Sequence, residues 1–128
     1  MSYYFSKKIT ATFEDAIVRV TEALKKEGFG VLTDIDVQAT LKKKLNAEFR
    51  KYRILGACNP PFAYQALLAE DKIGTMLPCN VIVQDLDKGV VEIAAVDPAA
   101  SMAAVDNPKL GDIAGQVRAK LKSVIDGL

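Results

Sequence analysis

Apolar and polar residues follow one another along this chain in patterns that predict strands and helices in turn. Residues 3–9 are aromatic and β-prone and predict a first strand. Residues 12–15 then resemble a helix-capping box, with aspartate in the place of the usual glutamate. A helix is expected from there to Gly28, because apolar residues recur at helical spacing. Those residues are Phe13, Ile17, Val20 and Leu24.

The same alternation continues through the middle of the chain. Residues 29–35 predict a second strand, and Asp36 is expected to cap a helix with Val37, Leu41 and Leu45 on one face. A third strand is predicted over residues 50–58, and it runs directly into Asn59-Pro60. Asparagine followed by proline suits the N-cap and the first position of a helix, so a helix is expected over residues 62–70.

The last third of the chain predicts a hairpin followed by two helices. Apolar residues alternate with polar ones after Cys79, residues 87–89 suit a turn, and residues 90–96 form the return strand. Asp97-Pro98 and Asn107-Pro108 repeat the pattern of Asn59-Pro60, so each is expected to open a helix. The last helix carries an amphipathic stripe that predicts packing on the sheet. The stripe consists of Leu110, Ile113, Val117, Leu121, Val124 and Leu128.

Strands and helices interleave irregularly in this prediction, and at least one strand pair is a hairpin. That order favours the α+β class over a doubly wound parallel sheet. We expect a mixed or antiparallel sheet of about five strands with helices packed on it. No linker divides the chain, so residues 1–128 are predicted to form a single compact domain.

Composition excludes several classes of function. The net charge is +1, far from the basic balance of a dedicated nucleic-acid-binding protein. No apolar run approaches the roughly 20 residues that span a membrane, and the first residues are too polar for a signal peptide, so a cytoplasmic location is expected. The chain contains no histidine, which removes Ser-His and Cys-His catalysis and every zinc site that uses imidazole.

The two cysteines are the most pointed chemical feature. Cys58 ends a predicted strand beside a helix start, an environment that favours the reactive thiolate, and the alternative is that it faces inward as a small apolar residue. Cys79 begins the hairpin strand. Their spacing matches neither a Cys-x-x-Cys motif nor a zinc knuckle. The thiols converge if the two strands are antiparallel neighbours, and lie at opposite edges if a crossover helix makes the strands parallel.

Three segments of the chain carry a family resemblance. Residues 54–60 (ILGACNP), 77–81 (LPCNV) and 96–98 (VDP) resemble the signature segments of the domain of unknown function 302 family. The resemblance covers nearly the whole chain and implies a compact α+β domain, often dimeric, in prokaryotic proteins without an established activity. Five residues coincide with the characteristic positions of that family, which implies either a shared site or a shared structural need. They are Cys58, Asn59, Pro60, Pro78 and Cys79.

Two charged features have both a functional and a structural interpretation. Six cations within residues 42–53 suit an anionic partner, or equally a solvated helix end followed by an edge strand that its charges protect. The pairs Glu14-Asp15 and Asp34-Asp36 suggest acid–base or metal chemistry, whereas helix capping explains Asp15 and Asp36 without it. Met102 in its alanine-rich run suits a small apolar pocket, although core packing is the preferred interpretation.

These observations predict a ligand site around Cys58 and Cys79 in a small homodimer. Cys58 is the expected nucleophile or first metal ligand, and Cys79 the resolving thiol or second ligand. Two thiolates suit Cu(I), four across a two-fold axis suit zinc, and no cofactor is otherwise implied. The competing hypothesis is a non-catalytic interaction or apolar-ligand module with buried cysteines. The remaining predicted ligand contacts are Asn59, Pro60, Tyr52, Tyr64, Pro78 and Asn80.

Overall fold

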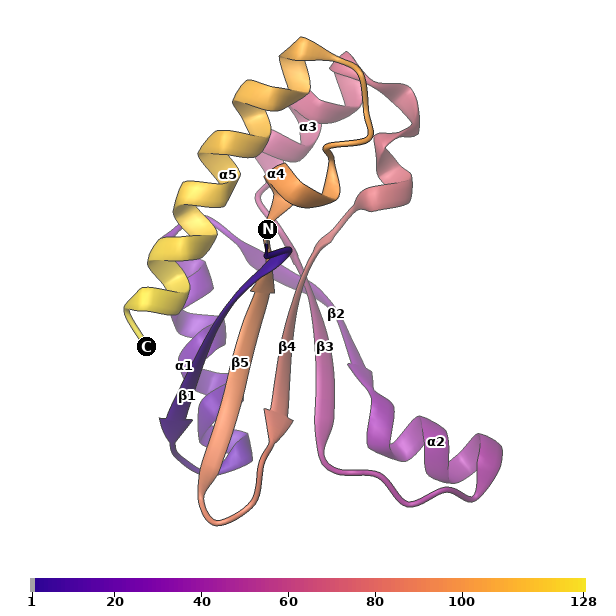
Figure 1. The fold of residues 1–128 in the computed structure, drawn as a ribbon, viewed down its shortest axis with the longest axis vertical. Helices are drawn as coiled ribbons and strands as arrows, with labels where there is room; N and C mark the ends of the chain where they lie inside the picture. The colour runs from indigo at the N-terminus through magenta and orange to yellow at the C-terminus, as the bar shows by residue number, and fades with distance from the viewer. Residues whose placement is uncertain (1) are drawn as a thin grey trace.

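The computed structural model describes residues 2–128 and contains one five-stranded sheet, with its strands in the order β1-β5-β4-β3-β2 (Figure 1). Every neighbouring pair is antiparallel, which confirms the α+β prediction and selects the antiparallel alternative. The elements in chain order are β1 Tyr4–Thr10, α1 Phe13–Lys26, β2 Gly30–Asp36, α2 Val37–Leu45, β3 Tyr52–Cys58, α3 Pro60–Ala69, the 3-10 helix η1 Asp71–Met76, β4 Cys79–Asp85, β5 Val90–Val96, α4 Pro98–Ser101 and α5 Pro108–Asp126.

The main core lies between one face of the sheet and the helices α1 and α5. Alternate residues of β4 and β5, such as Val83 and Ile93, are fully buried against these helices. Apolar residues recur about every second position along the strands and every 3.6 positions along the helices, as predicted. Their side chains therefore meet in one layer between the sheet and the helices. The helices contribute Phe13, Ala16, Val20 and Leu24 from α1, and Val117, Leu121, Val124 and Ile125 from α5.

The capping residues define where most helices begin. Thr12 Oγ1 accepts from Asp15 N at 3.1 Å, and Asp36 Oδ1 accepts from Ala39 N at 2.9 Å. Asp97 and Asn107 likewise accept from the amides two residues ahead, so these four predicted caps are confirmed. Asn59 occupies the N-cap position of α3 but makes no capping hydrogen bond with its side chain.

Three sequence expectations about position were wrong. The third strand begins at Tyr52 rather than residue 50, and the helix after it begins at Pro60 rather than residue 62. The suggested edge strand is also an inner one, since β3 lies between β2 and β4 and β2 forms the edge. Charges at residues 50–53 therefore do not protect a free edge; they lie at the end of the sheet where β3 begins.

A second, smaller apolar cluster joins α3, η1, α4 and α5 beyond the end of the sheet. Its buried residues are Ala66, Ile73, Met102, Leu110 and Ala114. In Figure 1 these helices gather above the strand ends at which β3 finishes and β4 starts, while α2 extends away from the opposite end. The upper half of α5 thus covers this cluster, and its lower half covers the sheet.

Candidate ligand-binding cavity

The end of β3 meets the start of β4, because Ala57 and Cys79 are paired across the two antiparallel strands. This is the condition under which the two cysteine-bearing segments were expected to come together. Cys58 and Cys79 consequently lie in neighbouring strands, one residue out of alignment. The sequence segments around both thiols therefore share one end of the sheet.

A cavity of about 280 Å³ lies at this end of the sheet, bounded by α3, α4 and α5. Its walls come from both apolar clusters: Phe29 and Val117 belong to the main core, and Ala66, Met102 and Ala114 to the smaller one. No charged side chain borders it, and Cys58, Asn59 and Cys79 contribute its few polar groups. The cavity is therefore an apolar space with a small polar corner.

Small side chains are the local reason for this cavity. Ala66 on α3 and Ala114 on α5 are both buried where these two helices approach one another, and Ala57 lines the cavity from β3. Alanine lets helix backbones approach but fills little volume, so space remains where larger residues would interdigitate. The cavity thus follows from residue size at three distant points of the sequence.

Burial determines the chemistry of Cys79. Cys79 is 8% exposed. Burial raises the pKa of its thiol to about 11, and the nearby Cys58 thiol contributes to this increase. Since the thiolate is the nucleophile and the metal ligand, a thiol with this pKa is unreactive near neutral pH. Cys58 is only partly buried. Of the two thiols, Cys58 is therefore the more exposed.

Asn59 joins two segments that are far apart in the sequence. Its Nδ2 donates a hydrogen bond to the Glu27 carbonyl at 3.1 Å, which ties the start of α3 to the end of α1. This bond replaces the predicted capping interaction, because the side chain points towards Glu27 instead of back along α3. Asn59 is only 8% exposed and borders the cavity.

The predicted site residues divide into two groups. Cys58, Asn59, Pro78 and Cys79 all border the cavity. The others do not: Tyr52 and Asn80 line a separate hollow of about 430 Å³ on the other face of the sheet, and Tyr64 and Pro60 are exposed on α3. The wall contributed by α4 and α5 was missing from the predicted site, and the alanine-rich run around Met102 was its only sequence signal.

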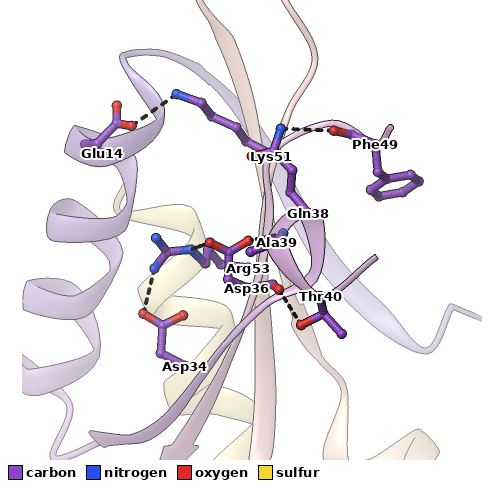
Figure 2. A network of polar contacts seen from close by, with 9 residues as sticks. All are labelled: Glu14, Asp34, Asp36, Gln38, Ala39, Thr40, Phe49, Lys51 and Arg53. Atoms are coloured by element: carbon purple, nitrogen blue, oxygen red, sulfur yellow. Dashed lines mark hydrogen bonds and ion pairs between the residues drawn. The ribbon is translucent and has the colours of Figure 1, made fainter. Parts of the chain in front are cut away.

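Three of the paired carboxylates form ion pairs with two cations of the basic segment (Figure 2). Arg53 Nη1 lies 2.9 Å from Asp34 Oδ2, and its Nε lies 3.6 Å from Asp36 Oδ2. Lys51, just before β3, pairs with Glu14 of α1 at 3.2 Å. A hydrogen bond to the Glu14 backbone, and next this contact with Lys51, lower the pKa of Glu14. Among residues 2–128, no group of three or more cysteine or acidic residues is arranged to hold a metal ion.

Comparison with known proteins shows what this fold is similar to. The model of the family described as "Domain of unknown function DUF302" matches residues 5–128. A crystal structure of an uncharacterized conserved DUF302 protein from Bacillus stearothermophilus superposes with a TM-score of 0.90 at 28% identity, over 98% of each chain. No curated protein matches the sequence. Within the described part of the chain, no helix combines the length and the apolar character that crossing a membrane requires.

Proposed function

This chain belongs to the DUF302 family, and we propose that it binds a small apolar molecule in the cavity between the strand ends and α3, α4 and α5. One observation carries the proposal: a cavity of about 280 Å³ has no charged side chain in its wall. Small-molecule sites typically have volumes of about 300–1,000 Å³ and mostly apolar linings with a few polar groups. An engineered apolar cavity of about 150 Å³ is already large enough for benzene.

The energetic argument also favours a ligand. A cavity lined by buried apolar side chains leaves those atoms without contacts on one side, and the loss of stability grows with cavity volume. A bound apolar molecule restores these contacts, and burial of its own surface contributes about 25 cal/mol per Å². The ligand is thus expected to stabilise the fold as well as to bind.

A titration with naphthalene tests the proposal directly. Methyl resonances of the three wall alanines, Ala57, Ala66 and Ala114, are expected to shift in proton–carbon NMR spectra, and the melting temperature is expected to rise. The exposed Ala119 on the outer side of α5 supplies the control resonance, which should stay in place. Unchanged spectra up to the solubility limit of naphthalene, and of bulkier apolar probes, would overturn the proposal.

The thiol hypothesis survives in a narrower form that involves Cys58 alone. Its partial exposure beside the cavity supports a reactive thiol, while the buried, protonated state of Cys79 argues against a resolving partner or a second metal ligand. A cytoplasmic location, where thiols stay reduced, fits this proposal. Elemental analysis of the reduced protein checks the soft-metal alternative, and stoichiometric bound copper or zinc would favour it over an apolar ligand.

A second copy of this chain is the proposed protein partner, and the free face of the sheet supports it. A row of paired residues crosses all five strands on the face opposite the α1 and α5 core. Five strands of seven residues present on the order of 550 Å² per copy, the scale of a small specific interface. The row consists of Ile35, Ile54, Ile82, Ala94 and Ser6.

Substitution in the middle of that row tests the homodimer. Ile82→Glu places a charge at the centre of the free face and is expected to convert a dimer into a monomer in analytical ultracentrifugation. Val18→Glu is the matched control, since Val18 is 58% exposed on α1, away from this face. A monomeric wild-type protein, or a dimer that Ile82→Glu leaves intact, argues against this interface.

A further inference from the structure

The side-chain amide of Asn59 is held in one orientation. Its Nδ2 lies 3.1 Å from the Glu27 carbonyl oxygen. A carbonyl oxygen only accepts hydrogen bonds, so the amide nitrogen must face Glu27 and Oδ1 must face the other way. The residue has little freedom to turn, because it is only 8% exposed and its amide is held by this hydrogen bond.

Oδ1 of Asn59 is an acceptor without a donor. Among residues 2–128, no N–H or O–H group donates to it, and α3 does not use it as a cap. No fully buried side-chain nitrogen or oxygen of the described residues lacks a partner, so Oδ1 must remain reachable from outside the protein. Asn59 also borders the apolar cavity, so its amide is one of the few polar groups that a molecule in the cavity could meet.

From this arrangement we infer that the cavity selects apolar molecules that end in a neutral hydrogen-bond donor, either a hydroxyl or an amide N–H. The inference rests on the proposed binding function and adds the class of ligand. A hydroxyl would satisfy Oδ1 while the apolar body fills the space between α3 and α5. A ligand without a donor would cover Oδ1 and leave it without a partner, which is costly, so such a ligand binds less tightly.

Charged head groups fit this cavity poorly. No lysine, arginine or acidic residue borders it, so a carboxylate or an ammonium group would lose its hydration without gaining an ion pair. A carboxylate would in addition place a negative charge against the Asn59 carbonyl oxygen. The cavity is therefore expected to bind a neutral alcohol or amide more tightly than the corresponding fatty acid anion or amine.

Octanol and its isomer methyl heptyl ether provide a matched pair of probes. They have the same atoms, and only octanol carries a donor. In titration calorimetry of the wild-type protein, octanol is expected to bind about fivefold more tightly than the ether. Octanoate at neutral pH is expected to bind more weakly than octanol. The Asn59 side-chain amide resonance should shift with octanol and stay in place with the ether.

A variant separates the role of Asn59 from general affinity. In Asn59→Leu, the preference for octanol over the ether should disappear while the ether still binds. The ratio of the two dissociation constants is the measure to use, because a general change in the cavity affects both probes alike. If Asn59→Leu does not fold, two wild-type measurements still test the inference: the ratio of the dissociation constants of octanol and the ether, and the shift of the Asn59 side-chain amide resonance. Equal binding of octanol and ether, or tighter binding of octanoate, overturns the inference and leaves the cavity function standing. Failure of both neutral probes to bind overturns both.

Discussion

Ala57 of β3 lies directly across from Cys79 of β4, so Cys58 is one residue out of register with Cys79. Both cysteines border the same cavity, and the Cys58 thiol is near enough to add to the raised pKa of Cys79. A disulfide requires Cβ atoms about 3.5–4.5 Å apart whose directions converge. The strands bring the two cysteines close together, and both are free thiols in this structure.

One reactive thiol is the expected result for the native, reduced protein. Cys58 should react with Ellman's reagent, whereas Cys79 should react only on unfolding, because it is buried and protonated. Cys58→Ser should abolish the native reaction, and Cys79→Ser should leave it. The measurement is the number of thiols titrated before and after denaturant. A native disulfide after mild oxidation, seen as a loss of both thiols by mass spectrometry, would contradict this assignment.

The raised pKa of Cys79 predicts a loss of stability at alkaline pH. In the unfolded chain the thiol ionises near its ordinary pKa of 9.0, whereas in the folded protein it ionises at about 11. The unfolded state therefore loses its proton first, so the contribution is complete below pH 9 and falls away as the pH rises towards 11. The expected loss is on the order of 2–3 kcal/mol, since one pKa unit corresponds to about 1.36 kcal/mol.

Urea unfolding at several alkaline pH values isolates this contribution. Cys79→Ala should show a shallower fall of the unfolding free energy than the wild type. Val83→Ala truncates a side chain at a buried position of the same strand. It should lower the unfolding free energy by a similar amount at every pH, so that the dependence on pH stays as in the wild type. Parallel curves for wild type and Cys79→Ala would show that Cys79 does not carry this pH dependence.

Local signals in the sequence were sufficient for most of the fold. Thr12, Asp36 and Asp97 cap helices because each is the nearest acceptor to an unpaired amide a few residues ahead. The hairpin between β4 and β5 was equally local, since residues 87–89 adopt the positive φ angles that its turn requires. Such interactions depend on neighbours in the chain, and the pattern of residues contains them.

The parts that sequence reasoning missed depend on distant neighbours. Asn59 is a good cap by type, but its amide binds Glu27, which lies 32 residues earlier in the chain. The cavity wall on α5 belongs to a helix whose periodicity predicts a buried face without saying what that face touches. Strand order likewise depends on residues far apart in the chain. The strand β3 is internal because β2 forms the edge, and no local pattern of residues distinguishes an internal strand from an edge strand here.

Gly56 is expected to tolerate no side chain. A Cβ at this position would lie 2.7 Å from Pro78 Cγ and closer still to Thr33 Oγ1. Gly56→Ala should therefore cost about 1–3 kcal/mol of unfolding free energy, the usual range for overpacking. Gly30→Ala is the matched control in the neighbouring strand, because nothing lies within 4 Å of its Cβ. If both variants unfold at the wild-type urea concentration, the contact with Pro78 and Thr33 is not restrictive.

Asp36 should matter more to stability than Asp34, although both pair with Arg53 (Figure 2). Asp36 also caps α2, so Asp36→Ala should cost about 1 kcal/mol. Asp34→Ala removes only a partly exposed ion pair and should cost about 0.5 kcal/mol or less, with the difference from wild type shrinking in high salt. Thermal unfolding at low and high salt provides the comparison. Equal costs would mean that the Asp36 cap contributes nothing measurable.

Filling the cavity should separate ligand binding from folding. Ala114→Phe extends a ring from α5 into the space between α3 and the strand ends. Because this space is lined by apolar side chains, the added ring gains contacts that the alanine lacks, and the melting temperature should stay the same or rise. Binding of naphthalene and octanol should fall at least tenfold, since the ring occupies their place. Ala119→Phe on the exposed side of the same helix should leave binding unchanged. If Ala114→Phe folds and still binds both probes with wild-type affinity, the ligand site lies elsewhere.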